Sequence, residues 1–148
     1  MASEVIQPIA EALAALADDL GMEGVVWPRG DLPNKGPWAV VGLPIVRRTA
    51  PEEREETGLG SNAWELSYTV TLLTDLGRPK ASHELVADRL EAWVAAVDAD
   101  RGLLTVAGTV VVIDSSVTES EPIQVLGVNR QLIGYETTVE ILAAVAST

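Results

Sequence analysis

The feature that most constrains how this chain can fold is the stretch 64–74, in which apolar and polar side chains alternate. The apolar set is Trp64, Leu66, Tyr68, Val70 and Leu72, and the polar set is Glu65, Ser67, Thr69 and Thr71. A period of two matches a β-strand, because successive side chains of a strand point to opposite faces. The stretch therefore predicts a long strand with one face in the core and the other in water.

Two helices are predicted on either side of that strand, from apolar side chains that recur every three or four residues. The first spans about 8–20, with Pro8 at a first helical position and Gly21 as its stop. The second spans about 81–97, with Ser82 as its N-cap. Their apolar stripes are Ile9, Leu13, Leu16 and Leu20 in the first helix and Val86, Leu90, Trp93 and Val97 in the second.

Further strands are predicted from short runs of β-branched and other apolar residues. These runs are Gly24–Trp27, Trp38–Val46, Thr109–Ile113, Ile123–Gly127 and Ile133–Leu142. Because Pro44 cannot donate a ladder hydrogen bond, the second run is predicted to have an edge position, a bulge or a break there. The polar segment 114–122 is predicted to be a turn between two strands.

The order of these elements predicts a single α+β domain over residues 1–148. A helix, three strands, a second helix and three more strands favour a mainly antiparallel sheet with two helices packed on one face. A chain of 148 residues has the size of one domain and can bury a substantial core, and it contains no internal repeat.

The composition excludes several classes of protein. The chain has no cysteine, which rules out disulfides and thiolate chemistry. No apolar run approaches the roughly 20 residues that cross a bilayer, and the first residues predict no signal peptide, so no membrane partner is expected. A formal charge of −12 disfavours wrapping nucleic acid, which requires cationic side chains. The same charge is also explained by solubility alone.

No residue pattern in the sequence predicts catalysis, a cofactor or a metal site. His83 is the only histidine, and the segment that follows it has Ala87 where the zinc-protease motif requires a second histidine. The glycines of 58–61 lack the lysine and spacing of a phosphate-binding loop. Asp98 and Asp100 are not followed by the glycine and glutamate of a calcium loop. We therefore expect a protein that is not an enzyme.

A long polar segment, 47–61, precedes the alternating strand. Connections of this length are usually functional or disordered. Its charged residues are predicted to form an interface loop, and a plain solvated loop is the alternative. They are Arg47, Arg48, Glu52, Glu53, Arg54, Glu55 and Glu56.

Over nearly its full length the chain resembles the tail terminator proteins of long-tailed bacteriophages, which are minor tail or neck proteins. The likeness is carried by the strand 38–46, the charged loop 47–61, the pattern Trp64-x-Leu66-x-Tyr68-x-Val70, the following helix with Leu85, Val86, Leu90 and Trp93, and the closing stretch 128–139. It is a likeness of architecture, because no invariant motif marks the family.

The resemblance implies a virion protein that assembles in the host cytoplasm as a homo-oligomer, most simply a hexameric ring. Such a ring caps the tail tube, ends tube polymerisation and joins the tail to the head. Its partners would be further copies of itself, the tail tube protein and a head-completion or stopper protein, while DNA passes through without specific binding. Glu52, Glu53, Glu55 and Glu56 would then lie in a loop that reaches the lumen or the tube. Another neck or head-completion protein and a small α+β ligand- or peptide-binding module remain alternatives.

Overall fold

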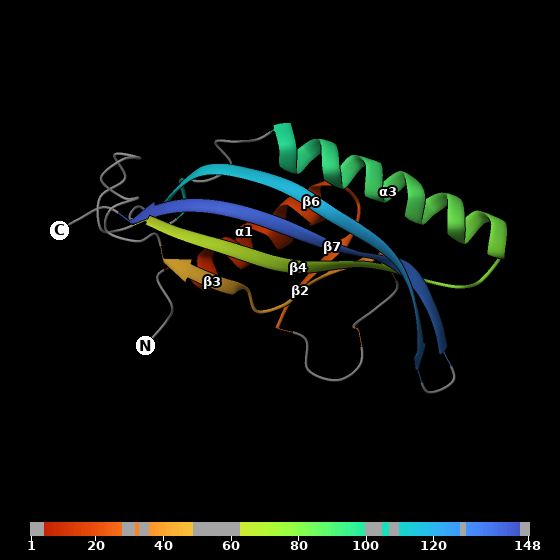
Figure 1. Cartoon of the computed structure of the whole chain (residues 1–148). Coiled ribbons are helices and arrows are strands. Elements are labelled where there is room, and N and C mark those ends of the chain that lie inside the picture. Colours follow the sequence, from red (N-terminus) through yellow and green to blue (C-terminus); the bar gives the residue numbers. More distant parts are fainter. Residues whose placement is uncertain are drawn as a thin grey trace.

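The computed structural model describes residues 5–27, 32, 36–48, 63–99, 105–106, 110–127 and 130–145. These residues form an α+β fold, which confirms the predicted fold class (Figure 1). The elements are α1 (Ile6–Asp19), β1 (Glu23–Val26), β2 (Trp38–Val41), β3 (Ile45–Arg48), β4 (Ala63–Asp75), α3 (Pro79–Ala99), β5 (Thr105–Val106), β6 (Val110–Gly127) and β7 (Arg130–Val145).

All the described strands belong to one sheet with the order β1-β2-β4-β7-β6-β5. Strand β3 also pairs with β4, beyond the end of β2. Among the described strands only β1 and β2 run parallel, and every other described pair is antiparallel. The sheet is thus mainly antiparallel, as predicted, and β4 lies near its centre.

The alternation of β4 is the reason for its central place. Leu66, Tyr68, Val70 and Leu72 are all buried, and they share one core with Val139, Ile141 and Ala143 of β7. Burying a side chain of this size contributes roughly 2 kcal/mol, so this one face supplies a large share of the stability. The strand predicted at 64–74 is confirmed.

Both helices pack on this same face of the sheet. Ile9 and Leu13 of α1 and Trp93 and Val97 of α3 belong to the core cluster that contains the inner side chains of β4. The Tyr68 hydroxyl donates to the backbone carbonyl of Ile6 in α1 at 2.6 Å. We call this side of the sheet the helix face and the opposite side the open face.

Both helices begin two residues earlier than the sequence predicts. Helix α1 begins at Ile6, so Pro8 is its third residue. Proline is tolerated there because the first four N–H groups of a helix have no partner within the helix. Helix α3 begins at Pro79, and the prediction of Ser82 as N-cap is wrong. The Ser82 hydroxyl instead donates to the carbonyl of Asp75 and accepts from the N–H of Gly77.

The predicted turn at 114–122 is wrong, because β6 runs continuously from Val110 to Gly127. Two register shifts, at 112/114 and 117/119, let the polar segment stay paired with β7. The Ser115 hydroxyl donates to the Val97 carbonyl, and the Val117 N–H donates to the Asp98 carboxylate. These hydrogen bonds to the C-terminal end of α3 satisfy polar groups in a segment whose composition predicts a turn.

A second, smaller apolar cluster lies on the open face at the far end of β4. Trp38, Leu73 and Leu132 are buried there, with Val25, Leu32, Val40 and Ile123 packed against them. Of the alternatives predicted at Pro44, the structure shows a break, since the chain leaves β2 at Val41 and enters β3 at Ile45. Beyond this cluster, the end of the β6–β7 hairpin curves away from the rest of the sheet (Figure 1).

Candidate functional site

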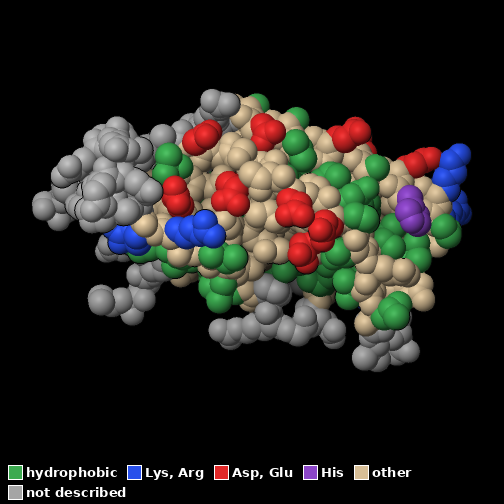
Figure 2. All heavy atoms as spheres, in the orientation of Figure 1, with side chains coloured by type: hydrophobic (Ala, Val, Ile, Leu, Met, Phe, Trp, Pro, Cys, Tyr) green, Lys and Arg blue, Asp and Glu red, His purple; other side chains and the backbone are tan. Residues whose placement is uncertain are grey.

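The open face of the sheet is strongly acidic. Side chains of β4 and β7 alternate between the two faces of the sheet. Because the apolar ones lie on the helix face, the polar residues between them lie on the open face. In this way Glu65, Asp114, Glu119, Glu121, Glu136 and Glu140 all come to the open face, from three neighbouring strands. Figure 2 shows acidic side chains spread over this side of the molecule.

Three of these carboxylates stand close together at the middle of the sheet. Glu121 is the direct cross-strand partner of Glu136, and Glu119 is the partner of Thr138. A shallow hollow of about 110 Å³ is lined by these four residues. Like charges placed directly opposite each other destabilise a sheet. The pair Glu121 and Glu136 therefore lowers the stability of the fold, and it is not needed to form the core.

A larger hollow of about 350 Å³ lies toward the β3 end of the open face. It is lined by Arg47, Glu65, Ser67, Asp114, Ser116, Glu140, Ile141 and Leu142. The Ser67 hydroxyl donates to the Glu140 carboxylate at 2.6 Å. Arg47 is the one cationic side chain among these lining residues, and it is the cross-strand partner of Glu65. The hollow is therefore polar and negatively charged apart from one arginine.

The two arginines predicted to open the interface loop lie in strand β3 instead. Arg47 reaches the open face, whereas the guanidinium of Arg48 stacks over the Trp64 ring at 4.4 Å. The Nε of Arg48 also donates to the Ala63 carbonyl at 3.1 Å, so Arg48 holds β3 against β4. The other predicted loop residues, Glu52, Glu53, Arg54, Glu55 and Glu56, lie outside the described residues.

Exposed large apolar side chains form two groups at opposite ends of β4. Leu43, Ile45 and Val46 are 76%, 68% and 37% exposed, in and just before β3. Val125 and Leu126 are 38% and 73% exposed near the end of β6. We call the first group the edge patch and the second the tip patch. No sequence pattern distinguishes the tip patch from core.

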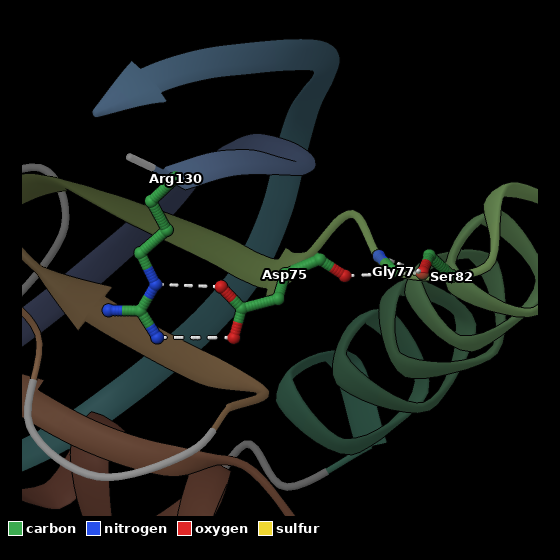
Figure 3. A network of polar contacts seen from close by, with 4 residues as sticks. All are labelled: Asp75, Gly77, Ser82 and Arg130. Carbon is green, nitrogen blue, oxygen red and sulfur yellow. Dashed lines mark hydrogen bonds and ion pairs between the residues drawn. The ribbon is translucent and has the colours of Figure 1, made fainter. Parts of the chain in front are cut away.

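A polar network fixes the hairpin end and α3 to the end of β4 (Figure 3). The Arg130 guanidinium donates to both carboxylate oxygens of Asp75, at 2.7 and 3.1 Å. It also lies 4.8 Å from the centre of the Trp38 ring. The backbone carbonyl of Asp75 accepts from the Ser82 hydroxyl at the start of α3. Asp75 therefore joins the sheet, the hairpin end and the helix in one place.

The single histidine of the chain lies at the surface. His83 is exposed on the first turn of α3, where its Nδ1 lies near the Pro79 carbonyl oxygen. Within the described ranges, no three histidine or acidic side chains are grouped as metal ligands. Nor does any described helix combine the length and apolar character of a membrane span. What the open face offers is a charged surface for contact.

Comparison with known proteins does not assign a family. No protein-family profile matches this chain, and no curated protein sequence matches it either. One solved structure aligns with this chain with a TM-score of 0.49 and 14% sequence identity. The match covers 96% of this chain and 93% of that one. A likeness at this level carries no conclusion about function.

Proposed function

We propose that this protein is a structural subunit of a phage tail, of the tail-terminator type. In this role it forms a ring, most simply a hexamer, that caps the tail tube, ends tube polymerisation and joins the tail to the head. Its partners are other copies of itself, the tail tube protein and a head-completion protein. The protein acts in the virion neck and takes part in no catalysis.

The observation that carries the proposal is the acidic open face. Six carboxylates from β4, β6 and β7 share it, and Glu121 and Glu136 stand directly opposite each other, although like charges in that position destabilise a sheet. A surface of this charge repels the phosphate backbone, because binding DNA depends on neutralising phosphates with cationic side chains. Lining a channel with the open face lets DNA slide through the ring without adhering.

The resemblance of the whole chain to tail terminators supports the same role. The described elements run helix, strands, helix and strands, which is the order on which the resemblance is based. The described residues carry exposed apolar side chains near both ends of β4, where they are available for contact with neighbours. These features suit a protein whose task is to fit between neighbours.

A tube-growth assay tests the proposal. Purified tail tube protein is allowed to polymerise while light scattering follows tube length, and this protein is added at substoichiometric amounts. We expect growth to stop, with negative-stain images showing an added ring at one tube end. Unchanged tube growth and bare tube ends would contradict the role of terminator.

The charge argument has its own matched pair of variants. Replacing Glu119, Glu121 and Glu136 by glutamine neutralises the middle of the open face. Replacing Glu84, Asp88 and Glu91 on the outer side of α3 by their amides removes the same charge elsewhere. We expect only the first variant to retain DNA on its rings at low salt while still capping tubes. Equal DNA retention by both variants would contradict the proposal that the open face lines the channel.

A small ligand-binding module is the second candidate function, favoured by one hollow on the helix face. This hollow has about 320 Å³ and lies between the start of α3 and the hairpin end. Its lining is His83, Val86, Pro122, Ile123, Gln124, Ile133, Gly134 and Tyr135. Small-molecule sites begin at about this size. A rise in melting temperature with a small molecule or peptide, together with no effect on tube growth, would favour this candidate.

A further inference from the structure

We propose that the two outer edges of the sheet are closed to strand addition, by an aspartate near the end of each helix and by Pro122. An unpaired strand edge offers a row of N–H and C=O groups with which another chain can pair. One outer strand is β1, and the other is β6, which in the described residues pairs with β5 at Val110 and Val111. The inference goes beyond the proposed function, because it concerns contacts between chains that the subunit prevents.

At β1 the outer edge is occupied by Asp18 of α1. The N–H groups of Glu23 and Trp27 donate to backbone carbonyls in and just before β2. Because successive N–H groups of a strand point to opposite sides, the N–H of Gly24 points to the outer edge. It donates to the Asp18 carboxylate at 2.8 Å. This donor is therefore not available to an incoming strand.

The close approach of α1 to β1 depends on the glycine at position 24. A Cβ there would lie 2.4 Å from the backbone carbonyl oxygen of Ala14 in α1. A larger residue would therefore push the strand away from the helix. With glycine, the end of α1 lies close enough for the Asp18 carboxylate to reach the strand edge.

At β6 the outer edge is occupied in the same way by Asp98 of α3. Val117 stands opposite Val139 of β7, but its N–H donates to the Asp98 carboxylate at 3.0 Å. The Ser115 hydroxyl donates to the Val97 carbonyl at 2.8 Å, so the end of α3 is held against β6 at two points. The outward N–H of Val117 is therefore already bonded within the chain.

Pro122 closes the next part of the β6 edge. Pairing with β7 continues on both sides of it, at Glu121 and at Ile123. A strand tolerates proline where the missing N–H faces away from the neighbouring strand, so Pro122 leaves a gap among the outward donors. The register shift between Val117 and Glu119 makes the same edge irregular. Natural sheets use edge prolines and bulges to avoid pairing with other sheets.

The position of the two aspartates is otherwise unfavourable. Asp18 and Asp98 are each the residue before the last in their helix, and neither helix has a basic residue in its last turn. The C-terminal end of a helix carries partial negative charge, so a carboxylate there lowers helix stability. Closing a strand edge accounts for the same unfavourable choice at the end of both helices. Contacts between copies then lie elsewhere than along these two edges.

Sedimentation of variants over a range of concentrations tests the inference. The opened variant combines Asp18→Ala, Asp98→Ala and Pro122→Thr, which removes both carboxylate acceptors and restores an outward N–H. Its matched control combines Asp19→Ala and Asp88→Ala. These are exposed aspartates of the same two helices, so the control removes the same charge.

Two further controls separate an open edge from other causes of association. Asp18→Asn with Asp98→Asn keeps an acceptor oxygen at each edge while it removes the charge. Val139→Ala removes apolar volume from the buried core, so it lowers stability and leaves both edges unchanged.

The opened variant should form assemblies larger than those of the wild type, at concentrations at least roughly tenfold below those that any of the three controls requires. In these assemblies, amide hydrogen exchange at 24–26 and 117–126 should be slower than in the dispersed variant. In dispersed Asp98→Ala, the Val117 amide should exchange at least roughly tenfold faster than in the wild type, because it has lost its acceptor.

Three results would overturn the inference. They are association of the opened variant no stronger than that of its matched control, association no stronger than that of Val139→Ala when equal fractions are unfolded, and assemblies protected from exchange away from both edges. If the opened variant does not fold, Pro122→Thr alone decides, because Pro122 is exposed. Association of that variant no stronger than that of the wild type then overturns the inference. None of these measurements includes tail tube protein, so their outcome is independent of the tube-growth assay.

Discussion

At the scale of single residues, the stability of the fold depends on the hydrogen bond made by a buried hydroxyl group. Tyr68 is fully buried at the centre of β4, and its hydroxyl donates to the Ile6 carbonyl at the start of α1. Burial raises the pKa of the Tyr68 phenol well above its ordinary value. The alternation of β4 predicts that Tyr68 points inward, but the identity of its acceptor follows only from how α1 crosses the sheet.

Replacing Tyr68 by phenylalanine should destabilise the protein by about 1 kcal/mol at pH 7, because the Ile6 carbonyl loses its partner. The loss should shrink at alkaline pH. Above about pH 10 the unfolded chain releases the phenol proton while the folded chain keeps it, so the wild type loses about 1.4 kcal/mol of stability per pH unit that the variant does not. Urea unfolding of both proteins at pH 7 and above pH 10 measures this. A constant difference across that range would contradict the account of Tyr68.

Gly134 is the second residue on which the sheet depends. A Cβ at this position would lie 1.6 Å from the Leu72 carbonyl oxygen. Gly134→Ala should therefore force β7 away from β4 and cost about 3 kcal/mol, as overpacking does in well-packed cores. Gly77→Ala is the control, since a Cβ there meets no atom within 4 Å. Equal melting temperatures for the two variants would show that β7 can yield at this point.

At the scale of elements, the sequence predicts the central strand and the core stripes of both helices well. These have strong periodicity, and the buried residues Leu13, Val86, Trp93 and Val97 all belong to the predicted stripes. The prediction fails for β6, where Asp114, Ser116 and Glu119 alternate toward water and Ser115 bonds to α3. Local composition there is typical of a turn, and only pairing with β7 along its whole length makes it a strand.

The hairpin end depends on its attachment to β4 through Arg130 and Asp75. The side chains of Arg130 and Asp75 are 34% and 43% exposed. Their two hydrogen bonds form one bidentate contact. Arg130→Met should destabilise the protein by about 1 to 2 kcal/mol and should speed amide hydrogen exchange at 121–127 before it affects the rest of β6. Arg130→Lys keeps the charge but loses the planar fork, so it should restore only part of the protection. Uniform exchange across the whole sheet would mean that the hairpin end does not open on its own.

At the scale of the whole molecule, the distribution of charge depends on strand register. Composition predicts an acidic protein, but it cannot predict that six carboxylates gather on one face, because that depends on the register of β4, β6 and β7. The predicted interface loop contributes Arg47 to the open face, while Arg48 packs on Trp64. The exposure of the tip patch could not be predicted. The sequence around Val125 and Leu126 predicts an ordinary strand, and only the position of the hairpin end shows that these side chains are exposed.

If the open face is kept acidic at a cost to folding, removing one of its charges should stabilise the subunit. Glu121→Gln ends the direct opposition to Glu136 and should raise stability by about 0.5 kcal/mol at low salt. The gain should shrink as salt screens the repulsion. Glu84→Gln is the control, because Glu84 lies 3.9 Å from Lys80 on the exposed side of α3. A loss of stability in Glu121→Gln would show that the carboxylates are held by favourable contacts instead.

The mass of the assembled protein tests the central claim most directly. Native mass spectrometry and sedimentation would be run across a range of concentrations, with and without tail tube protein. A ring-forming terminator predicts one discrete species near six times 15.7 kDa, free in solution or bound to tube ends. A strict monomer that ignores tube ends, or an open-ended series of polymers, would contradict it.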